Sequence, residues 1–214
     1  MKTRVFAKLA CSLLLPAVPA LAGVVFSDFP MSGSLDARLI NPYEVSNSFT
    51  LLSGATVNGV NFGLWMPSGA TITSVQWAIG TDPFGTEMGS GSAGVTATFN
   101  SAALYGYDLD LATFSFSSLN LPLGTYYLSL HGAVATDQAR WDINNAPGID
   151  VWDTANGHLS APGGCSFGGT CAESFQLLDN SGSTPEPSSW ALLASGLLAA
   201  ALRGKAVRRY LYRA

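Results

Sequence analysis

Apolar residues alternate with polar ones along most of the stretch from residue 24 to residue 182, and this period of two constrains the fold more than any other feature. The alternating runs are Val60, Phe62 and Leu64; Val75, Trp77 and Ile79; Val95, Ala97 and Phe99; Leu109 and Leu111; Phe114 and Phe116; Tyr126, Leu128 and Leu130; and Phe175 and Leu177. Successive side chains of a strand point to opposite faces of a sheet, so each run predicts a strand with one buried and one solvated face. This pattern is typical of antiparallel sheets.

Short clusters of Gly, Pro, Asn, Asp and Ser separate these runs, for example Pro67-Ser68-Gly69 and Asp82-Pro83-Phe84-Gly85. Such clusters favour turns, and no window of the stretch has the apolar stripe of a helix. The sequence therefore predicts an all-β fold, a single antiparallel β-sandwich or jelly-roll domain over residues 23–182. The segment Gly89–Gly94 matches G-x-G-x-x-G but is not followed by a helical pattern, so we expect it to be a flexible loop.

The charges of the chain are distributed very unevenly. Residues 23–184 contain 13 acidic side chains and only two basic ones, Arg38 and Arg140, which gives this stretch a net charge of −11. The other basic residues lie near the two ends of the chain. Because a nucleic-acid-binding domain needs cations to neutralise phosphates, this composition excludes nucleic acid as a partner.

The N-terminus has the three parts of a secretory signal peptide. Lys2, Arg4 and Lys8 form a basic start, an apolar run follows, and Ala20-Leu21-Ala22 has the small-x-small pattern of a signal-peptidase site. We therefore expect residues 1–22 to be a signal peptide that signal peptidase removes by cleavage after Ala22.

A second three-part element follows the predicted domain. Residues 183–187 form a polar linker, residues 188–202 are almost wholly apolar, and a basic cluster then extends to Arg213. The basic residues lie outside both apolar segments, and the positive-inside rule keeps such flanks in the cytoplasm while the stretch between them crosses the membrane. Residues 188–214 are thus expected to be a transmembrane sorting helix with a basic tail.

Pro185-Glu186-Pro187, the short apolar helix and the Arg-rich end, in this order, resemble the PEP-CTERM sorting signal of exopolysaccharide-producing Gram-negative bacteria. The resemblance implies that an exosortase, a membrane-embedded cysteine protease, removes or exchanges the tail. We expect an inner-membrane intermediate and then delivery to the cell surface or the extracellular matrix. The expected role there is structural or adhesive and linked to exopolysaccharide or biofilm. A tail-anchored periplasmic domain is an alternative.

Cys165 and Cys171 are the only cysteines after the predicted signal peptide. The flexible spacer between them and the oxidising compartment favour a local disulfide. A metal or redox pair is the rival interpretation, but a spacer of five residues fits it poorly.

Four oxygen-bearing residues, Asp142, Asn144, Asp150 and Asp153, echo the spacing of calcium ligands in an EF-hand loop. However, Pro147 stands where that loop needs Gly, and no predicted helices flank the segment. A calcium site is therefore one hypothesis, and a turn rich in Asp and Asn is the interpretation that we favour. No other cofactor is expected.

A carbohydrate site is the second binding hypothesis, and it would use Trp141 and Trp152. Both stand beside an aspartate in a stretch rich in loop-forming residues, so we expect them to be more exposed than Trp77, which is in phase with Val75 and Ile79. Exposed aromatic faces can stack on sugars, which makes a lectin-like module an alternative function. The competing interpretation places all of these indoles in the core.

Catalytic motifs are not evident in the chain. It has two histidines, His131 and His158, and no G-x-S-x-G nucleophile elbow. Asp108 and Asp110 fall on one face of a predicted strand, too close together to hold a sugar ring between them. We therefore expect a protein that is not an enzyme.

Overall fold

The computed structural model describes residues 23–146, 148, 150–154, 157–160 and 171–179, and for residues 150–154 and 157–160 it describes the backbone alone. These residues form strands, turns and a short 3-10 segment, η1 (Leu104–Gly106), so the prediction of an all-β fold is confirmed. None of them belongs to a helix long and apolar enough to cross a membrane. The predicted signal peptide, linker and sorting helix lie outside the described residues.

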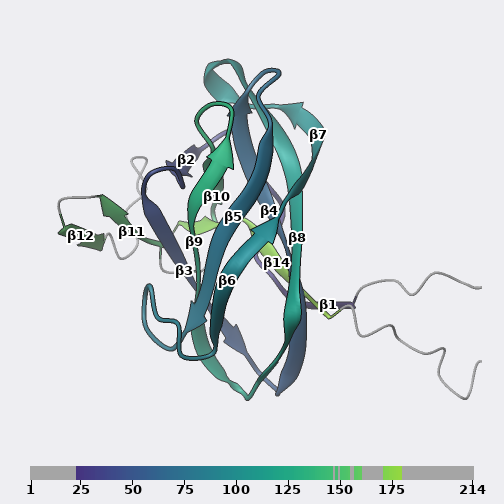
Figure 1. Cartoon of the computed structure of the whole chain (residues 1–214), viewed down its shortest axis with the longest axis vertical. Coiled ribbons are helices and arrows are strands. Elements are labelled where there is room, and N and C mark those ends of the chain that lie inside the picture. Colours follow the sequence, from purple (N-terminus) through teal and green to yellow (C-terminus); the bar gives the residue numbers. More distant parts are fainter. Residues whose placement is uncertain (1–22, 147, 149, 155–156, 161–170, 180–214) are drawn as a thin grey trace, which may run out of the picture.

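Within the described ranges, the strands form two antiparallel sheets (Figure 1). The eight-stranded sheet contains β1 (Gly23–Ser27), β2 (Asp36–Leu39), β4 (Ala55–Pro67), β7 (Thr96–Ala102), β8 (Tyr107–Leu121), β10 (Arg140–Asn144), β13 (Ala172–Glu173) and β14 (Phe175–Asp179). The six-stranded sheet contains β3 (Glu44–Leu51), β5 (Ile72–Gly80), β6 (Gly89–Gly94), β9 (Gly124–Ala135), β11 (Asp150–Thr154) and β12 (Gly157–Ser160).

The order of strands brings distant parts of the chain side by side. The larger sheet runs β1-β14-β4-β10-β13, with β2 beside β10 and with β8 between β4 and β7. The smaller sheet runs β12-β11-β3-β9-β5-β6. The first and last described strands, β1 and β14, therefore pair with each other, with Gly23 opposite Asp179.

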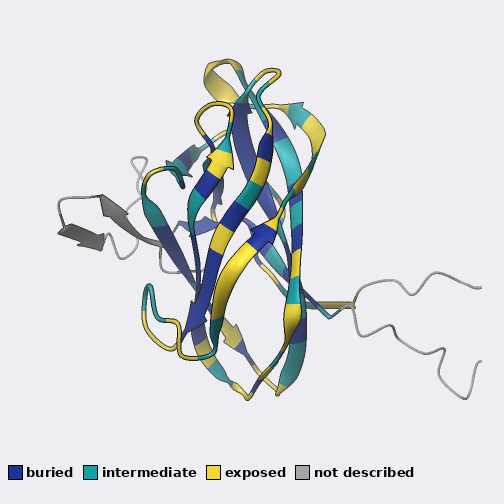
Figure 2. Ribbon diagram, viewed as in Figure 1, coloured by how far each residue is buried: buried dark blue, intermediate teal, exposed yellow. Residues whose placement is uncertain are grey.

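Both sheets contribute to one hydrophobic core. Phe62, Phe114 and Phe175 from the larger sheet are buried in the same cluster as Phe49 and Trp77 from the smaller one. Rings from the two sheets touch directly, because Trp77 stacks on Phe116 at 4.2 Å between centroids and Phe49 meets Phe175 edge-on at 6.0 Å. Along β5, Val75, Trp77 and Ile79 are buried, as the sequence pattern predicts (Figure 2). The alternation does not continue to the end of the strand, where Ala78 and Gly80 are buried as well.

Strand β8 explains why two separate apolar runs occur between residues 107 and 121. In one half of the strand, Phe114 faces the shared core. In the other half, Leu109 packs with Trp65 and Ala37 in a second, smaller cluster. The apolar pattern changes phase because the outer face of the sheet is covered at that end by residues 28–35, hereafter the β1–β2 segment.

Two local predictions are wrong. Gly89–Gly94 is not a loop but strand β6, which pairs with β5 and places Gly91 opposite Trp77. The indole packs against this strand, since a Cβ at Gly91 would lie 3.5 Å from Trp77 Nε1, an ordinary van der Waals distance. Phe99 is 62% exposed rather than buried, because β7 lies at the edge of the larger sheet, where it pairs with β8 alone.

The shared core predicts a large difference between two phenylalanines. Phe62→Ala should lower the free energy of unfolding by about 3–5 kcal/mol, because the ring is fully buried and its removal leaves a cavity. The matched control, Phe99→Ala, should change it by less than about 0.5 kcal/mol. Urea unfolding followed by tryptophan fluorescence measures both, and equal losses would contradict this description of the core.

Candidate functional site

The carboxylate of Asp142 is the most highly connected polar group among the described residues. It is fully buried on β10 and accepts four hydrogen bonds. Oδ1 accepts from the backbone N–H of Gly33 (3.0 Å) and from Trp65 Nε1 (2.6 Å). Oδ2 accepts from the backbone N–H of Ser32 (2.7 Å) and from Ser174 Oγ (2.9 Å). One side chain thus joins β4, β10, the residue between β13 and β14, and the β1–β2 segment.

Two glycines make this arrangement sterically feasible. Gly33 has φ +60°, a backbone conformation that glycine adopts without strain, and its N–H points at Asp142. Gly63 lies beneath the carboxylate, where a Cβ would come within 2.4 Å of Ser174 Oγ and 2.7 Å of Asp142 Cβ. A larger residue at position 63 would therefore displace the groups that bind the β1–β2 segment.

Burial is the dominant influence on the acidity of Asp142. Removal from water raises the pKa of this carboxyl, and the hydrogen bonds from Ser32, Gly33, Ser174 and Trp65 act in the opposite direction. The four donors therefore offset part of the cost of placing a carboxylate between the sheet and its covering segment.

Asn144, two residues further along β10, holds the other end of the same segment. Its Nδ2 donates hydrogen bonds to the carbonyl oxygens of Asp28 and Pro30, the latter at 3.0 Å. Its Oδ1 accepts from the backbone N–H of Ala146 at 2.8 Å. The outward-facing residues of β10 thus position the β1–β2 segment.

The expectation that Trp141 is exposed is wrong. Its side chain is fully buried in the shared core, edge-on to Phe62 and Phe175, and its Nε1 donates a hydrogen bond to the carbonyl oxygen of Ser174 at 3.0 Å. Trp141 therefore has no face to offer a sugar. Trp152 lies on β11, and its side chain is outside the described residues. Trp77 is buried, as predicted.

The calcium hypothesis is not supported for its first two residues. Asp142 and Asn144 lie in a strand rather than in a turn, and their oxygens already accept hydrogen bonds from N–H and O–H groups. β10 and β11 moreover belong to different sheets, so Asp142 and Asp150 are not part of one continuous loop. The side chains of Asp150 and Asp153 lie outside the described residues.

The remaining predicted sites fall mostly outside the described residues. Cys171 is buried, but Cys165 is not described, so their pairing stays a prediction. Ala22 and the motif Pro185-Glu186-Pro187 also lie outside the described residues.

A cavity of about 810 Å³ opens beside Asp28, at the start of the β1–β2 segment. Asp28 is only 6% exposed, and its Oδ2 accepts a hydrogen bond from Asn47 Nδ2 at 3.3 Å. Burial raises the pKa of this carboxyl to about 7, although the hydrogen bond from Asn47 lowers it. A carboxyl with so high a pKa in a cavity is a candidate functional group. Sequence reasoning missed it because its partners, Asn47 and Asn144, are distant in the chain.

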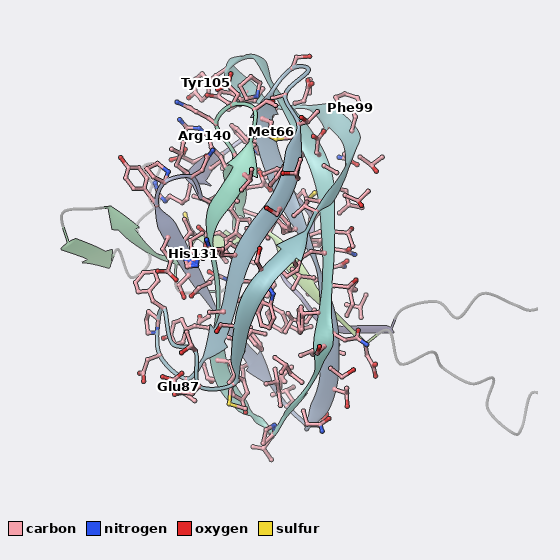
Figure 3. The ribbon with its side chains drawn as sticks, in the orientation of Figure 1. Met66, Glu87, Phe99, Tyr105, His131 and Arg140 are labelled. Carbon is pink, nitrogen blue, oxygen red and sulfur yellow. The ribbon has the colours of Figure 1, made fainter. Side chains whose placement is uncertain are left out.

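A second surface site lies around Arg140 and Tyr105, which are at the same end of the molecule (Figure 3). The Arg140 guanidinium lies 5.6 Å from the centroid of the Tyr107 ring, and its Nη2 donates to Gln138 Oε1 at 2.8 Å. Tyr105 is 79% exposed and has φ +60°. Together with Trp65, these aromatic residues and Arg140 line a cavity of about 270 Å³. An exposed aromatic ring, which we predicted at Trp141, is therefore found at Tyr105 instead.

The four hydrogen bonds of Asp142 generate a stability prediction. Asp142→Asn should lower the free energy of unfolding by about 2–4 kcal/mol, because an amide directs its own N–H groups at protein donors and leaves some of them unpaired. The control is Asp82→Asn, at an exposed turn residue, which should have an effect within about 0.5 kcal/mol. Urea unfolding at neutral pH measures both, and a loss as small as that of the control would contradict the role assigned to Asp142.

Asp28 predicts a pH dependence of stability. Its folded pKa of about 7 lies above the ordinary value of 3.8, so between these two values the folded state holds a proton that the unfolded state has lost. The resulting stabilisation is complete below about pH 4 and is lost as the pH rises through about 7.

Comparison with Asp28→Asn isolates this contribution, because the raised pKa values of Asp110 and Asp142 are common to both proteins. The difference in the free energy of unfolding between wild type and variant should fall between about pH 4 and pH 7 and then stay level. Urea titrations across this range measure it. A constant difference would show that Asp28 has an ordinary pKa.

Residues 183–209 match the family model of the PEP-CTERM protein-sorting motif. The match begins two residues before Pro185 and includes the apolar run and most of the basic cluster. No curated protein and no solved structure matches the chain. The chain therefore carries the PEP-CTERM sorting signal of an exported protein that an exosortase processes.

Proposed function

We propose that this protein is a structural or adhesive component of the cell surface or extracellular matrix, associated with exopolysaccharide and without enzymatic activity. The observation that carries the proposal is the sorting motif at residues 183–209, which follows an all-β domain. In this proposal, the domain is a β-sandwich that the motif delivers. The single core to which both sheets contribute supports that architecture.

The proposed delivery follows from the chemistry of the tail. Signal peptidase removes residues 1–22, and the apolar run from residue 188 to residue 202 holds the exported domain at the outer face of the inner membrane. Pro185 and Pro187 disfavour a helix at the motif, because proline lacks a backbone N–H and disfavours helix in the residue that precedes it. An exosortase would thus meet an accessible, non-helical substrate.

The charge of the domain suits this destination. With 13 acidic and two basic residues between positions 23 and 184, copies of the domain repel one another, which keeps a protein soluble at high local concentration. The proposal that it is not an enzyme rests on the sequence, in which no nucleophile elbow accompanies the two histidines.

The mass of the native protein tests the proposal. We expect intact mass spectrometry of cell-surface and medium fractions to find a chain that begins at Gly23 and ends close to residues 185–187. A chain that extends to Ala214 and occurs only in inner-membrane fractions would instead identify the alternative, a tail-anchored periplasmic domain.

A variant pair makes the test specific for the motif. Replacement of Pro185, Glu186 and Pro187 by alanine should leave the tail uncleaved and the protein in the inner membrane. Replacement of Asn180, Ser181 and Gly182 by alanine, just before the matched residues, should leave processing unchanged. Equal processing of the two variants would contradict recognition through this motif.

A further inference from the structure

The cavity beside Asp28 has the composition of a binding site rather than of a packing defect. Its lining combines aromatic rings with polar side chains, including Phe29, Phe49, Ser48, Asn144 and Asn145. Its volume of about 810 Å³ is within the range of small-ligand sites, which is about 300–1,000 Å³. The polar groups come from three separate parts of the chain, and they converge because the β1–β2 segment lies against β3 and the end of β10.

Asp28 offers the cavity an acceptor that the protein does not use. Oδ2 accepts from Asn47, whereas Oδ1 has no hydrogen-bond partner among the described residues. Asn47, directly behind it, is fully buried, and its own Oδ1 is also unpartnered within the described part of the chain. A ligand hydroxyl that donates to Asp28 would therefore satisfy an existing acceptor without breaking a protein hydrogen bond.

The backbone that carries Asp28 is held in place before any ligand arrives. Its N–H donates to the carbonyl oxygen of Phe175 at 2.9 Å, and its carbonyl oxygen accepts from Asn144. The same Asn144 side chain fixes Pro30. Because the carboxyl is already positioned, binding loses little free energy to the ordering of the site.

The charges of the cavity select the class of ligand. Among the described residues, those that line it include one carboxyl, from Asp28, and no lysine, arginine or histidine. A uronate or sulfated sugar would meet this carboxyl without a compensating cation. A neutral ligand with many hydroxyls can donate to Asp28, exchange hydrogen bonds with serine and asparagine side chains, and place an apolar face on a phenylalanine ring.

We propose that the cavity beside Asp28 binds a neutral sugar unit of a polysaccharide, with Asp28 Oδ1 accepting a hydrogen bond from a sugar hydroxyl. The inference rests on the proposed association with exopolysaccharide for the source of the sugar. It assigns binding to the cavity between β1 and β3 in place of the indole of Trp141, which is buried.

Affinity electrophoresis of the full-length protein in mild detergent tests the proposal. Separate native gels contain one of three polymers: a neutral galactomannan, a neutral mixed-linkage glucan, or alginate, which is an acidic polyuronate. We expect retardation by at least one neutral polymer and none by alginate. The gels are run at pH 8, above the pKa of about 7, so that Asp28 is ionised. Asp28→Asn should then weaken that affinity about tenfold, because it replaces a charged acceptor by a neutral amide. Asn145→Ala, at the rim, should weaken it by a smaller factor.

Asp82→Asn is the matched control, since it makes the same chemical change at an exposed residue outside the cavity lining, and it should migrate as the wild type does. Thermal melts of all variants establish that they are folded. Equal retardation of wild type and Asp28→Asn would overturn the proposal, as would the absence of retardation by either neutral polymer. Preferential retardation by alginate that Arg140→Gln abolishes would also overturn it and would assign binding to the surface around Tyr105.

These outcomes are independent of the sorting test. A processed protein at the cell surface that no neutral polymer retards would leave the proposed function standing and remove the sugar site. Retardation that depends on Asp28, in a protein found only at full length in the inner membrane, would support the sugar site and contradict the proposed function.

Discussion

The buried carboxylate of Asp142 determines how the outer face of the larger sheet is covered. A carboxylate removed from water is unfavourable unless donors surround it, and here two backbone N–H groups of the β1–β2 segment supply half of the four hydrogen bonds. The segment in turn covers Trp65 and Leu109, which would otherwise present an apolar surface to water. The charge and its cover therefore depend on each other, and the glycine at position 63 makes room for both.

Strand β10 connects this interaction to the core and to the cavity. Its inward face carries Trp141 into the shared core, while its outward face carries Asp142 and Asn144 to the β1–β2 segment. This strand of five residues thus contributes both to the packing of the two sheets and to the position of Asp28. Because Asn144 holds the carbonyl of Asp28, the depth of that carboxyl, and with it the raised pKa, follows from the geometry of the strand. A change in β10 is expected to alter the core and the cavity together.

The strands with a clear apolar alternation, such as β4, β5 and β9, could be predicted from the sequence, whereas the glycine-rich strand β6 and the polar site could not, for a physical reason. Burial on one face of a sheet repeats every second residue, so runs such as Tyr126, Leu128 and Leu130 record it locally. The pattern misled where a strand is buried on both faces or lies at an edge: Trp141 is buried beside a buried Asp142, and Phe99 is exposed. The hydrogen bonds of Asp142 span about 110 residues to Ser32, and such a pairing leaves no local trace in the sequence.

Charge acts on this domain over two distances: the net charge affects how whole molecules associate, and the charges inside the cavity affect which ligand binds. Its net charge of −11 acts between molecules and opposes their association, but salt screens such fields within about 8 Å at physiological ionic strength. Inside the cavity, the nearest charges determine which ligand is favoured, and within the described part of the chain Asp28 is the only ionisable residue of the lining. An acidic polymer is thus disfavoured at both distances, whereas a neutral one is indifferent to the distant field and gains an acceptor at close range. The selection of a neutral ligand therefore follows from the local composition of the cavity, which a count of charges along the chain does not reveal.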